Sequence, residues 1–148
     1  MDIADKIGLI ENKFNEYKDW EDKYRVLIKM GKSLSSLKDV DQVPKFEIKG
    51  CQSKVWLKPS LKSSRVHFEA GSDAILVKGI IGVLLEVYSG AKPAEILSHP
   101  PEFLGNIGIV DHLSLNRTNG LRAMVKQIQT YASLFNNLVD RGVEDADI

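Results

Sequence analysis

Apolar residues recur at helical spacing through the first part of the chain. Residues 3–14 carry an isoleucine or phenylalanine every three or four positions, with acidic residues between them, and this predicts an amphipathic helix. A second helix is predicted to begin near Asp19, a good capping residue. Its expected core stripe consists of Trp20, Tyr24, Leu27, Ile28 and Leu34. The polar stretch 35–44 breaks the pattern, and its final proline ends any helix.

From Lys45 the apolar period changes to two, which is the period of a β-strand. Alternation predicts three short strands, at residues 45–49, 53–58 and 65–70. We expect a turn at 50–52 to join the first two strands and a loop at 59–64 to join the second and third. An antiparallel meander is the simplest arrangement of these strands.

The chain then returns to helical patterns. Ser72 is predicted to cap a buried helix over residues 74–88, which Gly90 ends. Residues 92–112 contain three prolines and predict two short helical fragments.

The last long helix is predicted to begin near Asn116 or Arg117 and to run to about Asp140. Its expected buried stripe consists of Leu121, Met124, Val125, Ile128, Tyr131, Ala132, Phe135 and Leu138. The acidic tail 143–148 is expected to be frayed. The sequence therefore predicts one α+β domain over residues 1–148, with a core at about 10–140 and helices flanking a small three-stranded antiparallel sheet.

Composition narrows the functional classes. Twenty basic residues balance twenty acidic ones, which disfavours a nucleic-acid or membrane partner despite the lysines and Trp56 near the predicted turn. The start of the chain lacks the pattern of a secretory signal. The most apolar stretch, 74–88, is too short and too interrupted by charge to span a bilayer. We therefore expect a soluble, cytoplasmic protein.

Cys51, the only cysteine, lies in the predicted turn. Free cysteines are usually buried, whereas a thiol at a turn is reachable. Its ordinary pKa of about 8.5 leaves little thiolate at neutral pH, so a reactive cysteine needs nearby groups that stabilise the thiolate. Such groups could be backbone N–H groups of the turn, Lys49 and Lys54, or a cation elsewhere in the fold. A cysteine with no role remains an equal alternative at this point.

Other chemistries fit the side-chain inventory less well. Zinc and iron–sulfur sites usually need about four Cys or His ligands, and the chain has one cysteine and three separated histidines, His67, His99 and His112. A thiol hydrolase would need Cys51 and a histidine such as His112. Thiol peroxidases commonly use a resolving cysteine, which is missing here. No phosphate-binding loop is found, since Lys78 falls within a predicted helix. A lone reachable thiol can hold a cargo atom but cannot discharge it through a second thiol of its own.

Four segments follow one another along the chain: DWEDKY (19–24), GCQSKVW (50–56), GSDAILVKGIIGVLLEVYSG (71–90) and DHLSLNRTNGLRAM (111–124). Taken together and in this order, they resemble the SufE/CsdE family of sulfur acceptors. The resemblance extends from about residue 10 to 133. It departs from the family pattern at Gly71, where many members carry aspartate.

The resemblance implies a fold like that of the IscU-type scaffold proteins, with Cys51 as the working thiol in a loop. It also implies a sulfur carrier rather than a stand-alone enzyme. Such a carrier takes persulfide sulfur from a cysteine desulfurase of the SufS or CsdA type, stimulates that enzyme, and passes the sulfur to a scaffold of the SufB type. Pyridoxal phosphate belongs to the desulfurase, so no cofactor is implied here.

Matched positions suggest supporting residues for the thiol. Arg117 would stabilise negative charge on sulfur or grip the partner. Asp73 would help to shape the site, although a role at the helix start is an equal alternative, and Gln52 would fix the turn. His112 matches a family histidine, although a packed or surface role suits it better. Two hypotheses remain: a persulfide carrier, and a docking module that activates a desulfurase without needing Cys51.

Overall fold

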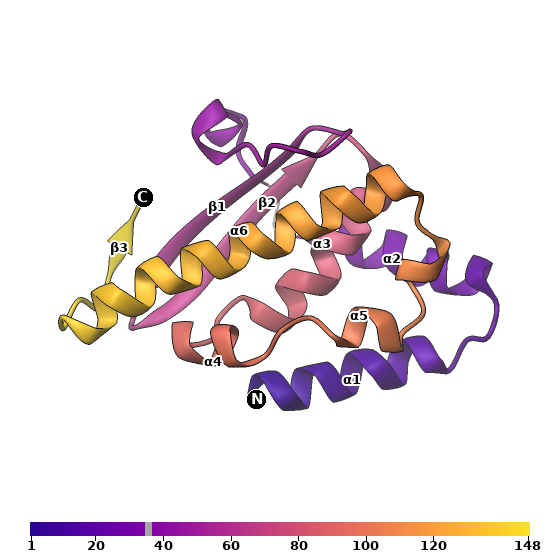
Figure 1. The fold of residues 1–148 in the computed structure, drawn as a ribbon, viewed down its shortest axis with the longest axis horizontal. Coiled ribbons are helices and arrows are strands. Elements are labelled where there is room, and N and C mark those ends of the chain that lie inside the picture. Colours follow the sequence, from indigo (N-terminus) through magenta and orange to yellow (C-terminus); the bar gives the residue numbers. More distant parts are fainter. Residues whose placement is uncertain (35–36) are drawn as a thin grey trace.

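The computed structural model describes residues 1–34 and 37–148, and Figure 1 shows how its elements are arranged. The α-helices are α1 (Ile3–Asn15), α2 (Trp20–Lys32), α3 (Ile75–Tyr88), α4 (Pro93–Ser98), α5 (Phe103–Asn106) and α6 (Leu115–Asp140). The strands are β1 (Val55–Lys62), β2 (Arg65–Ser72) and β3 (Ala146–Asp147). Short 3₁₀ turns lie at η1 (Asp39–Asp41), η2 (Pro44–Phe46) and η3 (Val110–His112).

The described elements form an α+β fold with a three-stranded antiparallel sheet, as predicted. The strand order is β2-β1-β3, so the predicted meander is wrong: the third strand comes from the C-terminal segment and pairs with β1. β1 and β2 form a hairpin that pairs Val55 with Ser72 at one end and Lys62 with Arg65 at the other. Ser63 and Ser64 close the hairpin with φ angles of 52° and 63°, which is the left-handed geometry of a tight two-residue turn. The predicted loop at 59–64 is therefore wrong for most of its length, because β1 continues to Lys62.

The strand predicted at 45–49 is also wrong. Its first residues lie in the 3₁₀ turn η2, and only Glu47 forms an isolated bridge, to Trp56. Phe46 and Ile48 are both buried, so the alternation of buried and more exposed side chains was predicted correctly although the strand was not. Pro44, which opens η2, favours a turn at this point, because proline has a fixed φ and no N–H for a ladder.

The acidic tail, expected to be frayed, contributes the third strand. Ala146 and Asp147 of β3 pair with β1. The Asp145 carboxylate accepts a hydrogen bond of 2.8 Å from the Ser63 N–H at the hairpin turn, and the Glu144 carbonyl accepts one of 2.9 Å from the Ser64 N–H. Acceptors in the acidic segment thus tie the tail to the exposed N–H groups of the hairpin.

Helix α3 is the buried helix that the sequence predicted, and it packs against α2, β2 and α1. Glycines allow α2 and α3 to approach closely: a Cβ built on Gly79 would lie 2.5 Å from the Leu27 carbonyl oxygen, and one built on Gly31 would lie 2.8 Å from the Gly79 nitrogen. None of the described helices is long and apolar enough to cross a membrane. The break expected at 35–44 is seen from residue 37 onward, and residues 35–36 lie outside the described part.

Helix α6 begins at Leu115, slightly earlier than predicted, and ends at Asp140 as predicted. Ser114 caps it, accepting a hydrogen bond from the Arg117 N–H. Its buried positions are Gly120, Leu121, Met124, Ile128, Ala132 and Phe135. Val125, Tyr131 and Leu138 of the predicted stripe are only partly buried. In Figure 1 this helix runs the length of the molecule, and its N-terminal end lies near the end of the sheet where β1 begins.

Candidate functional site

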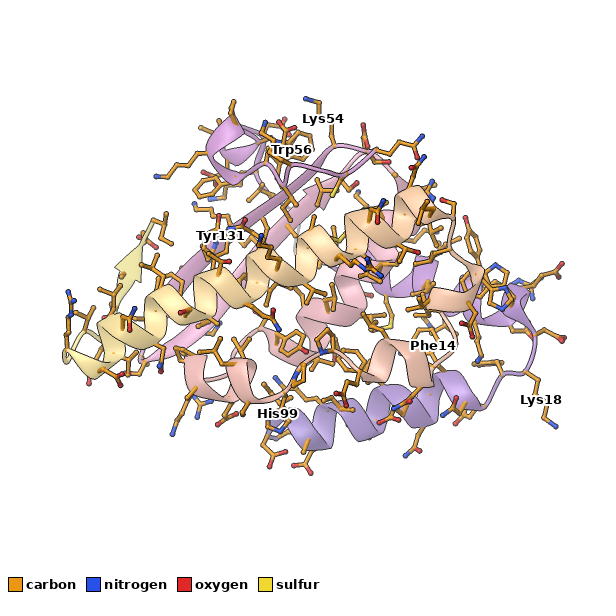
Figure 2. All side chains as sticks on the ribbon, viewed as in Figure 1. Phe14, Lys18, Lys54, Trp56, His99 and Tyr131 are labelled. Atoms are coloured by element: carbon orange, nitrogen blue, oxygen red, sulfur yellow. The ribbon has the colours of Figure 1, made fainter. Side chains whose placement is uncertain are left out.

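Cys51 lies in a turn that extends from the start of β1. The Ile48 N–H donates to the Val55 carbonyl at 2.8 Å and closes the base of this turn. Gly50 has a φ of 89°, a left-handed conformation that glycine adopts without strain. Lys54, labelled in Figure 2, projects from the surface at this end of the sheet, near Trp56. We call residues 49–54 the Cys51 turn.

The Cys51 thiol rests against helix α6. Its Sγ donates a hydrogen bond of 3.7 Å to the Gly120 carbonyl oxygen. A Cβ built on Gly120 would lie 3.5 Å from this Sγ, so an alanine would already contact the thiol and a larger side chain would crowd it. Cys51 is half-buried in this position, and burial raises the pKa of its thiol. The resting group is therefore a protonated, partly sheltered thiol at neutral pH.

In this conformation, the lysines and N–H groups that were expected to stabilise a Cys51 thiolate do not do so. Lys49 and Lys54 both pair with Glu47, at 3.7 Å and 3.6 Å, which neutralises part of their charge. No described backbone N–H donates to Sγ, and the sulfur itself donates to Gly120. This conformation shelters the thiol, and none of these groups stabilises its thiolate.

Ser72 and Asp73 hold the far side of the turn. The Asp73 carboxylate accepts a hydrogen bond of 3.1 Å from the Lys54 N–H, and the Ser72 hydroxyl donates one of 2.7 Å to the Lys54 carbonyl. The prediction that Ser72 caps the following helix is wrong, since Ala74 occupies the cap position. Ser72 instead accepts from the Ala74 N–H at 3.2 Å and joins the helix start to the turn.

Arg117 and Gln52, which were predicted to support the thiol, make no side-chain hydrogen bond in the described structure. Arg117 lies in the first turn of α6, one turn before Gly120 and so on the same side of the helix. Its guanidinium makes no hydrogen bond or ion pair with any described residue. The side chain of Gln52 is exposed and makes no hydrogen bond within the described chain. Gly120, Ser72 and Asp73 fix the turn in its place.

His112 does not form a pair with Cys51. It is exposed in η3, and its ring stacks on Trp20 with centroids 4.4 Å apart and planes 10° apart. No hydrogen bond joins its ring nitrogens to any residue that the structure describes. A Cys–His dyad for thiol hydrolysis is therefore not assembled.

Two residues of the site were not singled out from sequence. Gly120 was missed because its contact with Cys51 joins positions 69 residues apart, although a glycine inside a helical pattern was an available signal. Glu47 was missed because it was assigned to an ordinary strand face. In the described residues, no group of three His, Cys, Asp or Glu side chains gathers as a metal site would require.

Comparison with known proteins identifies the family. The SufE family profile, described as an Fe-S metabolism associated domain, matches residues 9–132. An uncharacterized SufE-like protein of Rhizobium etli is 39% identical over 121 residues, covering 78% of this chain and 82% of its own. A second uncharacterized SufE-like protein, from Rhizobium meliloti, is 35% identical over 119 residues, covering 77% of this chain and 85% of its own.

The fold also has a solved counterpart. The solution structure of a hypothetical protein from Thermus thermophilus superposes with a TM-score of 0.76 at 20% identity, covering 89% of this chain and 96% of that one. At this identity the likeness shows the fold alone. Fold and turn together define an α+β protein that presents one thiol beside a long helix. The chain belongs to the SufE family, which associates it with iron–sulfur metabolism.

Proposed function

We propose that this protein is a sulfur acceptor and carrier that takes persulfide sulfur onto Cys51 from a cysteine desulfurase of the SufS or CsdA type. It then passes the sulfur to an iron–sulfur assembly scaffold of the SufB type and stimulates the desulfurase. The observation that carries the proposal is the geometry of the only thiol in the chain. Cys51 sits in a turn held by groups from three other segments, next to a helix rather than in the core.

The transfer is a thiol exchange in which atoms and electrons balance. The Cys51 thiolate attacks the outer sulfur of the donor persulfide, a new S–S bond forms, and the S–S bond of the donor breaks. The donor cysteine leaves as a thiolate and takes up the proton that Cys51 gave up. No net oxidation occurs, and the chain needs no cofactor of its own for this step, because pyridoxal phosphate serves the desulfurase.

Arg117 is the residue that we expect to assist this transfer. It lies one helical turn from the Gly120 carbonyl that holds the thiol, and a guanidinium stabilises thiolate or persulfide charge. Burial against α6 raises the pKa of the Cys51 thiol, so we expect the turn to leave this position before Cys51 attacks. Docking on the desulfurase is the step that we assign to this release.

The intact mass of the protein tests the proposal. After incubation with a SufS-type desulfurase and cysteine, without reductant, we expect the mass to increase by one sulfur atom. Cys51→Ala should show no increase, and Arg117→Lys should load more slowly with its fold intact. A wild-type protein that binds an active desulfurase and gains no sulfur would contradict the carrier role.

A second candidate is a docking module that activates the desulfurase without using its thiol. The sheltered, protonated state of Cys51 favours this candidate. Desulfurase turnover in the presence of Cys51→Ala separates the two. A carrier variant without its thiol loses the stimulation, whereas an activator keeps it.

A further inference from the structure

One carboxylate lies between the two lysines that flank Cys51. Glu47 Oε2 is 3.7 Å from Lys49 Nζ, and Glu47 Oε1 is 3.6 Å from Lys54 Nζ. The Glu47 side chain is only 20% exposed, whereas the side chains of Lys49 and Lys54 are 76% and 60% exposed. The backbone of Glu47 is fixed by its bridge to Trp56. A fixed anion at the base of the Cys51 turn therefore holds two exposed cations, one on each side of the thiol.

Each of the other contacts that hold the turn involves one residue of the turn only. The Gly120 carbonyl holds Cys51, while Ser72 and Asp73 hold Lys54. Among the described contacts of the turn, the Glu47 carboxylate is the one that reaches both sides of Cys51.

We propose that Glu47 is a positioning residue: by bridging Lys49 and Lys54, it holds the Cys51 turn in its closed conformation, in which the thiol lies against α6. This role in sulfur transfer rests on the proposed function of Cys51, but the closure itself is a property of the free protein. Opening the turn moves the thiol away from Gly120, so Glu47 sets how readily an incoming sulfur reaches Cys51.

The bridge has the properties of a weak, reversible closure. Both pairs exceed hydrogen-bond distance, and exposed ion pairs of this kind are individually weak and screened by salt. A partner that contacts Lys49 or Lys54 therefore breaks the bridge at little cost. Glu47→Gln keeps the shape of the side chain and removes the charge, so it isolates the electrostatic part of the contact.

Alkylation of Cys51 by iodoacetamide in the folded protein measures the closure. The pH dependence of thiolate absorbance has a midpoint that reports the thiol pKa. The alkylation rate at about pH 8, where lysine side chains keep their charge, divided by the thiolate fraction gives the plateau rate, which reports how often the sulfur is accessible. We expect Glu47→Gln to raise the plateau about three-fold, which corresponds to about 0.7 kcal/mol at 1.4 kcal/mol per tenfold. Raising the salt to about 1 M, where the Debye length is about 3 Å, should narrow the difference from wild type.

Two further measurements support the assignment. Hydrogen exchange at the Lys54 amide should accelerate in Glu47→Gln, because an open turn exposes this group. Lys54→Gln should raise the plateau in the same direction. The double variant should raise the plateau by a smaller factor than the two single-variant factors multiplied together, because both substitutions remove the same ion pair.

Glu69→Gln is the matched control. Glu69 is also half-buried and lies on the neighbouring strand opposite Lys58. Its substitution should leave the plateau unchanged. Thermal unfolding by circular dichroism checks that each variant is folded.

Three outcomes would overturn the proposal. They are a wild-type plateau in Glu47→Gln, a shift of the midpoint alone, and an equal effect in Glu69→Gln. The sulfur-loading experiment is read separately: a protein that takes no sulfur but shows the altered plateau refutes the carrier role and keeps the closure.

Discussion

Replacing Gly79 with alanine should destabilise the packing of α2 against α3. The added Cβ would lie 2.5 Å from the Leu27 carbonyl oxygen, 2.8 Å from its carbonyl carbon and 3.0 Å from its Cβ. Two of these three atoms belong to the α2 backbone, so no side-chain rotation relieves the clash. The helices must separate instead, and overpacking of this kind costs about 1–3 kcal/mol or more.

The intrinsic preference of helices for alanine opposes this cost by about 1 kcal/mol. Because the overlap is with backbone, we place the packing cost at about 3 kcal/mol and the net loss of stability at about 2 kcal/mol. For a chain of this size such a loss lowers the midpoint of thermal unfolding by about 4–8 °C.

Gly8→Ala is the matched control for this prediction. Gly8 also lies inside a helix, α1, but a Cβ built there has no heavy atom within 4 Å. Its replacement should therefore stabilise the protein by about 0.5–1 kcal/mol. Thermal and urea unfolding followed by circular dichroism measure both variants. If Gly79→Ala raised the midpoint as Gly8→Ala should, the close approach of the two helices would be wrong.

The remaining predictions concern the Cys51 turn. Gly120→Leu should push Cys51 off α6 and speed its alkylation at neutral pH, whereas Gly120→Ala fits at ordinary contact distance and should change the rate little; equal rates in the two variants would contradict this. Asp73→Ala removes the acceptor for the Lys54 N–H and should cost about 1–2 kcal/mol, read from urea unfolding, with faster hydrogen exchange at Lys54. Because burial raises the pKa of the Cys51 thiol, folding retains the proton that the unfolded chain releases. The contribution of Cys51 to stability should therefore be full below the unfolded pKa and be lost as pH rises through the folded one. Comparing the pH dependence of unfolding in wild type and Cys51→Ala checks this, and identical profiles would contradict it.

The long helices could be predicted because their patterns are local. The buried helix at 74–88 and the end of α6 at Asp140 were correct to within about a residue. A turn at Cys51 was also predicted correctly, because Gly50 marks it, although it is longer than 50–52 and the strand expected before it does not form. These features depend on residues a few positions apart.

The errors arose where distant segments decide the structure. Residues 45–49 have the alternation of a strand, but tertiary packing buries Phe46 and Ile48 in and beside a 3₁₀ turn. The tail forms β3 by pairing with β1, and the hairpin N–H groups of Ser63 and Ser64 hold the residues just before it. The contact of Cys51 with Gly120 depends on how α6 lies across the start of the sheet, which no local pattern encodes.

The shelter of Cys51 has a consequence for oxidative damage. Peroxide attacks the thiolate, and the sulfenic acid that results is usually rescued by condensing with a second thiol. This chain has no second cysteine, so oxidised Cys51 would depend on outside thiols or proceed to irreversible sulfinic acid. Because burial raises the pKa of the Cys51 thiol, the thiol in its position against Gly120 should react slowly with peroxide, so the closed turn protects the only cysteine in the sequence from oxidation.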